Sequence, residues 1–157
     1  MDIRLLLDNI RSTHNVGSIF RTAETLGISH IYCGGTTPTP IDRFGRKRAD
    51  IAKVSLGGEE LVPWEQIGSA GMVELISKLK KEGFQIISIE QDPTSVDYKK
   101  VKVAGKALVI VGNEVGGVAQ EILDLSDVIA EIPLQGKKES LNVSVAAGVA
   151  LFRLLDH

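Results

Sequence analysis

A chain of 157 residues is long enough to bury one hydrophobic core without disulfide bonds, and 43% of these residues are hydrophobic. Its formal net charge of -2 is that of an ordinary globular protein, so overall charge does not indicate a nucleic-acid partner. The single cysteine, Cys33, excludes an intramolecular disulfide and a multi-cysteine zinc site. The three histidines, His14, His30 and His157, are scattered, so we expect no metal centre.

The sequence shows no segment typical of targeting or membrane insertion. Its start lacks a charged stretch followed by a long apolar run, and no run is long enough to span a bilayer. We therefore expect a cytoplasmic protein, and we find no repeat, low-complexity tract or linker that would divide it into domains.

The first third of the chain reads as a strand, a helix and a second strand. Residues 4–8 predict a buried strand, and a polar loop follows over residues 9–15. A helix is predicted to start near Asn15, because apolar residues recur at helical spacing until Gly27, a natural C-cap. Arg21 falls between the apolar stripe and the solvent face. A short strand is predicted at residues 30–34.

Residues 35–53 are predicted to form a long loop, and long loops tend to be functional or mobile. Four basic residues lie within six positions and interleave with Phe44, which is a local form of the basic-plus-aromatic signature of nucleic-acid binding. The alternative is a solvated, poorly ordered loop, and the segment alone leaves both open. The candidate contacts are Arg43, Arg46, Lys47, Arg48 and Lys53.

The remaining elements alternate between helices and strands. Trp64 is interpreted as a core residue, residues 72–79 as an amphipathic helix and residues 84–90 as a strand. Further predicted elements are a strand at 107–111, a short helix at 119–125, a strand at 128–132 and a final helix capped by Ser140 or Asn142. The continuous apolar runs favour an α/β fold with a mostly parallel sheet sandwiched by helices.

Several polar residues follow the predicted strands directly, where open α/β sheets bind ligands. Glu114 lies in the turn after one strand, and Ser140 and Asn142 lie between another strand and the final helix. Asn15 and Arg21 could complete such a cluster. Taken singly, Asn15 could be only an N-cap and Arg21 only a surface salt bridge.

The turn that begins at Gly112 has a glycine-rich sequence, Gly-Asn-Glu-Val-Gly-Gly, but matches neither the dinucleotide fingerprint nor a P-loop. By itself it indicates only a tight strand-to-helix turn.

Three segments in order resemble the motifs of SpoU/TrmH-type RNA ribose 2′-O-methyltransferases, a family of the SPOUT superfamily. They are residues 15–23, Asn-Val-Gly-Ser-Ile-Phe-Arg-Thr-Ala, residues 111–117, Val-Gly-Asn-Glu-Val-Gly-Gly, and residues 132–144, which begin with Ile-Pro-Leu and end with Ser-Leu-Asn-Val-Ser. The match spans essentially the whole chain. It implies a single methyltransferase domain over residues 1–157, without an added RNA-binding domain.

The resemblance also implies a carboxy-terminal trefoil knot, S-adenosylmethionine as cofactor, and a homodimer with its catalytic pocket near the subunit interface. The implied catalytic residues are Asn15, Arg21, Glu114, Ser140 and Asn142, and the implied cofactor-binding residues are Gly112, Ile132, Leu134 and Leu141. Neither metal nor cysteine is required. The expected partner is RNA, with tRNA favoured over rRNA.

Within that scheme Arg21 suits a phosphate next to the target ribose and electrostatic stabilisation, because a guanidinium is too hard to deprotonate to act as a base. Glu114 is expected to orient Asn15 or Arg21. Ser140 and Asn142 are expected to position the substrate and the knot loops. Two alternatives stay open: a catalytically silent knotted RNA-binding protein, and a small-molecule α/β enzyme that binds a nucleotide at the Gly112 turn.

Overall fold

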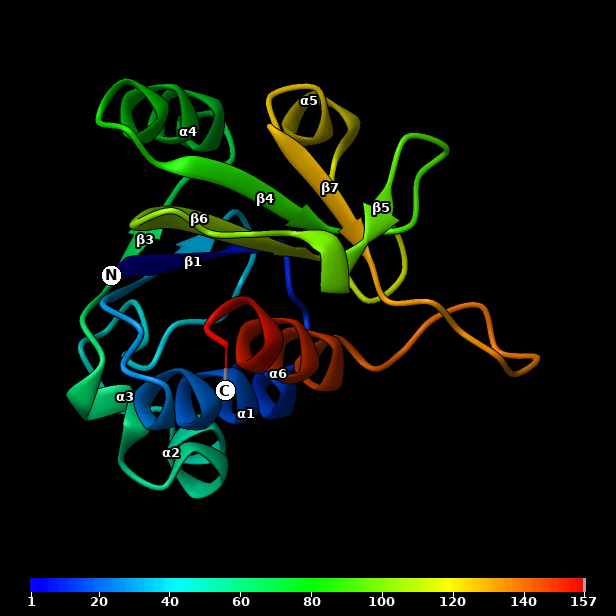
Figure 1. Ribbon diagram of the computed structural model, residues 1–157. Coiled ribbons are helices and arrows are strands. Elements are labelled where there is room, and N and C mark those ends of the chain that lie inside the picture. Colours follow the sequence, from blue (N-terminus) through cyan, green and yellow to red (C-terminus); the bar gives the residue numbers. More distant parts are fainter. Residues whose placement is uncertain (157) are drawn as a thin grey trace.

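The computed structural model describes residues 1–156 and contains one seven-stranded sheet with helices on both faces (Figure 1). In chain order the elements are β1 (Asp2–Asp8), α1 (Thr13–Thr25), β2 (His30–Gly34), α2 (Ala49–Ser55), α3 (Gly58–Leu61), β3 (Trp64–Ile67), α4 (Gly71–Lys81), β4 (Gln85–Ile89), β5 (Val96–Asp97), the 3-10 helix η1 (Tyr98–Lys100), β6 (Lys106–Gly112), α5 (Gln120–Leu123), β7 (Val128–Glu131) and α6 (Val143–Leu154).

The strands are ordered β3-β2-β1-β6-β4-β7-β5, and every neighbouring pair is parallel. Central strands β1 and β6 are buried on both faces, which explains their continuous apolar sequences. Leu5 and Val109 pair in register and pack with α1 and α6, whereas Leu6 and Leu108 belong to the core under α4 and α5. Figure 1 shows α1, α2, α3 and α6 covering one face and α4 and α5 the other.

The first helix begins earlier than predicted. Ser12 is its N-cap and accepts a hydrogen bond from the Asn15 amide at 3.2 Å, so α1 starts at Thr13. The interpretation of Asn15 as an N-cap is therefore wrong. Because the capping role belongs to Ser12, the side chain of Asn15 is available for contacts outside its own helix.

The predicted loop over residues 35–53 ends at Arg48, because α2 begins at Ala49. Strands β3 and β5 were not predicted from the sequence, since both lie at the edges of the sheet and carry exposed or half-buried residues without clear alternation. Trp64 is half-buried at the start of β3 and packs against the core.

Because all strands run parallel, the loops that follow them gather at one edge of the sheet. These loops include residues 9–12, 35–48, 90–95, 113–119 and 132–142. The candidate site lies among them. None of the helices described in residues 1–156 is long and apolar enough to cross a membrane.

Candidate active site

Glu114 joins the turn after β6 to the start of α1. Its carboxylate accepts hydrogen bonds from the backbone amides of Arg11 at 2.9 Å and Ser12 at 3.0 Å, and from Asn15 Nδ2 at 3.1 Å. These donors lie at the amino end of a helix, where the free backbone amides favour a negative charge. Glu114 therefore fixes the first turn of α1 against the loop that follows β6.

The same contacts determine the ionisation of Glu114. Partial burial of its carboxylate would by itself raise the pKa, but the hydrogen bonds from the Arg11 and Ser12 amides and from Asn15 outweigh it and hold the pKa below its ordinary value. The group is consequently an anion at neutral pH. It can accept hydrogen bonds and orient donors, but it has no proton to give.

Asn15 is buried and connects Glu114 to the carboxy-terminal helix. Its Nδ2 donates to Glu114, while its Oδ1 accepts a hydrogen bond from Asn142 Nδ2 at 3.1 Å. A continuous hydrogen-bonded chain thus runs from Glu114 through Asn15 to Asn142. It links the three segments on which the resemblance in the sequence rests.

Asn142 also caps α6. Its Oδ1 accepts from the Ser144 amide at 2.9 Å and from Ser144 Oγ at 2.6 Å, which confirms Asn142, rather than Ser140, as the N-cap. With its oxygen engaged by the helix, its amide nitrogen is directed to Asn15. The cap therefore sets the position of the side chain as well as the start of the helix.

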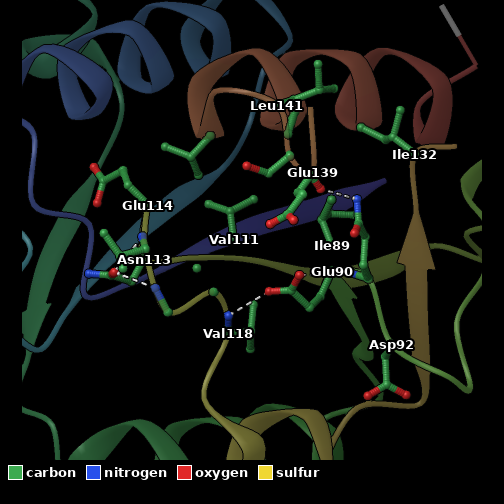
Figure 2. A pocket seen from close by; sticks show the side chains of 18 of the residues that line it. Ile89, Glu90, Asp92, Val111, Asn113, Glu114, Val118, Ile132, Glu139 and Leu141 are labelled. Carbon is green, nitrogen blue, oxygen red and sulfur yellow. Dashed lines mark hydrogen bonds between the residues drawn. The ribbon is translucent and has the colours of Figure 1, made fainter. Parts of the chain in front are cut away.

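A cavity of about 430 Å³ opens beside these hydrogen-bonded side chains, at the carboxyl ends of β4, β6 and β7 (Figure 2). Its apolar lining includes Val111, Ile132, Leu134 and Leu141. The volume lies in the range typical of small-molecule sites. Of the residues singled out from the sequence, those that line it are Gly112, Glu114, Ile132, Leu134, Ser140 and Leu141.

Four carboxylate side chains contribute to the lining of this cavity: Glu90 and Asp92 from the loop after β4, Glu114 from the turn after β6, and Glu139 from the loop before α6 (Figure 2). No lysine, arginine or histidine is among the lining residues of the described part of the chain. Such a lining disfavours phosphate groups and favours a ligand that carries positive charge. Glu90, Asp92 and Glu139 were not among the residues to which the sequence assigned a catalytic or cofactor-binding role. For Glu90 the available signal was its place at the end of a predicted strand.

The turn after β6 is closely packed. A Cβ at Gly112 would lie 2.2 Å from the backbone of Gly117, and Gly117 has a φ of 69°. Asn113 Oδ1 accepts from the amides of Val115 and Gly116, and Glu90 Oε2 accepts from the Val118 amide at 2.9 Å (Figure 2). The glycines are therefore needed for the path of the backbone that lines the cavity.

The structure does not bring Arg21 into the cluster. Arg21 is exposed on α1, roughly 9 Å further along the helix than Asn15 and about 120° around its axis. It lines neither this cavity nor the one formed by the loop after β2. Burial raises the pKa of the Cys33 thiol to about 12, so Cys33 is not a reactive thiolate.

The basic residues of the loop after β2 lie elsewhere on the same edge of the sheet. Arg43, Arg46 and Arg48 line a second cavity, whereas Lys47 forms a salt bridge with Glu60. Lys53 is exposed on α2.

Among residues 1–156 no group of three or more histidine, cysteine, aspartate or glutamate side chains could hold a metal ion.

The parallel α/β sheet, with an acidic, partly apolar cavity at the carboxyl ends of its strands, places this chain among α/β proteins whose topology suits ligand binding. Residues 2–152 match the model of the SpoU rRNA Methylase family, so the chain belongs to that family. This confirms the assignment made from the three motifs.

Individual relatives support this membership. The chain is 30% identical over 151 residues to the tRNA (guanosine(18)-2′-O)-methyltransferase of Aquifex aeolicus, covering 96% of this chain and 67% of the relative. It is 29% identical over 150 residues to the 23S rRNA (guanosine-2′-O-)-methyltransferase RlmB of Coxiella burnetii, covering 96% and 56%. The chain thus spans between about half and two thirds of the length of these curated relatives.

The structure is also similar to that of an AdoMet-bound rRNA methyltransferase from Sinorhizobium meliloti. The TM-score is 0.86 at 25% identity, with 99% of this chain and 56% of that chain covered. The mostly parallel α/β fold is therefore the one found in this family.

Proposed function

We propose that this protein transfers a methyl group from S-adenosylmethionine to a ribose 2′-hydroxyl of RNA. The observation that carries the proposal is the hydrogen-bonded chain Glu114–Asn15–Asn142 beside the acidic cavity, in a member of the SpoU family. The relatives named above are 2′-O-methyltransferases of tRNA or 23S rRNA. A silent RNA-binding protein would have no need of this arrangement.

The first cavity suits S-adenosylmethionine. Apolar side chains such as Ile132, Leu134 and Leu141 can contact a purine ring, and the surrounding carboxylates match a sulfonium and an ammonium group. The absence of cationic lining residues in the described chain disfavours a nucleoside triphosphate, which argues against the alternative of a nucleotide-binding enzyme at Gly112. When bound, S-adenosylmethionine supplies an already activated methyl group.

The protein must then hold the ribose oxygen in line with that group and favour loss of the hydroxyl proton. Asn142 is assigned to substrate positioning, and the buried Asn15 holds its side-chain amide in place. Glu114 orients Asn15. Ser140 is exposed on the loop that lines the cavity and is assigned to substrate positioning.

Arg21 is assigned to phosphate binding and charge stabilisation, which requires that it reach a site outside its own protomer. We infer a homodimer in which Arg21 serves the partner subunit's cavity. An exposed apolar stripe on α6 supports this: Val145 is 50% and Val149 37% exposed, and α6 packs directly beside α1. Val115, 85% exposed, adds apolar surface at the cavity.

For RNA contact we propose Arg43, Arg46, Lys47, Arg48 and Lys53. Neutralising Arg46, Lys47 and Arg48 together should weaken RNA binding and flatten its salt dependence, because fewer counterions are released. We favour tRNA as the substrate on the basis of the Aquifex aeolicus relative, with rRNA as the alternative. Comparing tRNA and rRNA-fragment transcripts as methyl acceptors tests this choice.

We further propose that residues 90–142 form the trefoil knot of the SPOUT superfamily. Residues 132–142 cross from β7 to α6, which covers the face opposite α5, and Gln91 Nε2 donates to the Glu139 carbonyl at 2.9 Å. A crystal structure with S-adenosylhomocysteine bound would test the threading. An open, unthreaded path would refute it.

Calorimetric titration with S-adenosylmethionine, S-adenosylhomocysteine and ATP tests the cofactor assignment. We expect the first two to bind and ATP not to bind. Preferential binding of ATP would refute the assignment and revive the nucleotide-binding alternative.

A further inference from the structure

A second cavity lies at the same edge of the sheet as the first but shares no lining residue with it. It has a volume of about 810 Å³ and is bounded by the loop over residues 35–48 and by β3. Its lining includes Arg43, Phe44, Arg48 and Trp64. The volume is sufficient for a nucleotide.

The loop that forms this cavity is fixed by its own hydrogen bonds. Asp42 Oδ1 accepts from the amides of Phe44 at 2.8 Å and Arg46 at 3.0 Å, and the Asp42 amide donates to the Arg46 carbonyl at 2.8 Å. Ile41 and Lys47 form an antiparallel bridge. The loop is therefore an organised turn. The alternative interpretation from the sequence, a poorly ordered loop, does not describe it.

Phe44 is presented at the tip of this turn, where it is 65% exposed. The guanidinium carbons of Arg43 and Arg46 lie 4.8 Å and 5.0 Å from the centre of its ring. An exposed aromatic ring next to planar guanidinium groups is a surface on which nucleobases stack, while the same guanidinium groups reach phosphates.

The charge of the cavity also suits a nucleotide. Arg48 Nε is buried without a hydrogen-bond partner, which is costly unless a ligand supplies an acceptor. Asp42 is the only acidic residue among the lining residues of the described chain, and its carboxylate is already engaged by the loop and by Arg46 Nε. The cavity is thus net positive, in contrast to the acidic first cavity.

We propose that this second cavity binds one unstacked nucleotide of the RNA substrate, with its base on Phe44 and its phosphate near Arg43 and Arg48. The inference rests on the proposed function, because it takes the RNA to be the methyl acceptor. It adds a separate subsite that holds the strand away from the methylated ribose.

A short polar connection joins the two cavities. Asn9, which has a φ of 55°, accepts from the Thr36 amide through Oδ1 at 2.9 Å and from Asn113 Nδ2 through its carbonyl at 2.7 Å. Thr36 lines the second cavity and Asn113 the first. An RNA strand held in the second cavity therefore lies along the same edge of the sheet as Glu114.

Trp64 provides a direct signal for occupancy, because it is the single tryptophan of the chain and lines the second cavity. We would follow its fluorescence during titration with a short single-stranded oligoribonucleotide. Inorganic polyphosphate of equal charge is the control for phosphate without bases, and an acidic peptide is the control for a protein partner. We expect a change with the oligoribonucleotide alone.

A matched pair of variants distinguishes the loss of a residue that lines the cavity from the loss of one positive charge elsewhere on the loop. R43A and K47A each remove one positive charge from the same loop, but only Arg43 lines the cavity. We expect R43A to weaken RNA binding clearly more than K47A. F44A should weaken RNA binding roughly tenfold, whereas F44Y should bind RNA about as well as the unchanged protein, because a stacking ring is retained.

Equal effects of R43A and K47A, or a response of Trp64 to polyphosphate or the peptide, would overturn the proposal. So would unchanged Trp64 emission while RNA binding is detected by fluorescence anisotropy. Methyl transfer and calorimetric binding of S-adenosylmethionine, measured in parallel, report on the first cavity. If methyl is transferred and S-adenosylmethionine binds while Trp64 emission does not change, only the proposal of a second subsite is refuted. If Trp64 emission changes but no methyl is transferred, only the proposed reaction is refuted.

Discussion

Glu114 Oε1 and Asn15 Nδ2 lie 3.1 Å apart although the two residues are separated by 99 positions in the chain. This contact holds the loop after β6 against the first turn of α1. Because Asn15 also accepts from Asn142, the amino-terminal helix, the turn after β6 and the carboxy-terminal helix are connected at one point. Changes at any of these three side chains should therefore affect the others.

Two substitutions of Asn142 should separate its capping role from its contact with Asn15. N142A removes the cap of α6 and should lower the free energy of unfolding by about 1 kcal/mol. N142D keeps an oxygen for the cap but loses the amide donor to Asn15. We expect urea denaturation to show that N142D keeps the contribution of the cap to stability, and assays to show reduced methyl transfer. Full activity of N142D would mean that the bond to Asn15 has no part in the reaction.

The depressed pKa of Glu114 predicts a pH dependence of stability. A carboxyl group with a lower pKa in the folded state stabilises the fold above its unfolded pKa of about 4.3, and this contribution is lost as pH falls through the folded value. The difference in unfolding free energy between wild type and E114Q should thus be greatest near neutral pH. We expect it to stay below about 1 kcal/mol, because the residue is exposed.

Urea titrations of both proteins from pH 7 to pH 3 measure this difference. It should shrink as the pH falls. A difference that is constant over the whole range would show that the ionised form of Glu114 does not stabilise the fold.

Gly112 should tolerate no side chain. In G112A the new Cβ would lie 2.2 Å from the Gly117 backbone, so the turn must shift, at a cost of about 1–3 kcal/mol. We expect binding of S-adenosylmethionine to weaken as well. G136A is the matched control, because no atom lies within 4 Å of a Cβ at that position. Similar thermal denaturation and calorimetry for both variants would contradict the proposed importance of the turn.

Mixing two inactive variants tests whether Arg21 acts across a dimer. In a heterodimer of R21A and E114A, one cavity would combine an intact Glu114 with the partner subunit's intact Arg21. After unfolding and refolding together, an equimolar mixture should recover about a quarter of wild-type methyl transfer, because half of the dimers carry one complete site. Each variant refolded alone is the control. No recovery from mixtures that contain heterodimers would place Arg21 in its own protomer's site.

The sequence predicted those elements whose pattern is set by burial. Strands β1 and β6 are buried on both faces, and helices α1 and α6 have regular apolar spacing and capping residues. Edge strands β3 and β5 were missed because half-exposed strands of two to four residues carry little periodic signal. The start of α1 was misplaced because Ser12, Thr13 and Asn15 are all plausible near a helix end.

The site was predicted as far as local rules allow. The rule that parallel strands end at one edge brought Glu114 and Asn142 together, and Asn15 was added as a residue of the first helix that could complete the cluster. The acidic surroundings of the cavity were missed because Glu139 and Asp92 lie on loops whose paths depend on distant contacts. The separation of Arg21 from Asn15 follows from helical geometry and could have been predicted.

The most direct test of the proposed reaction is nucleoside mass spectrometry after the protein is incubated with RNA and S-adenosylmethionine carrying a deuterated methyl group. The proposed reaction predicts labelled nucleosides with the methyl on the ribose 2′-oxygen, and loss of that label in an N15A variant. A label on a base, or an unlabelled RNA from a protein that binds both S-adenosylmethionine and RNA, would contradict it.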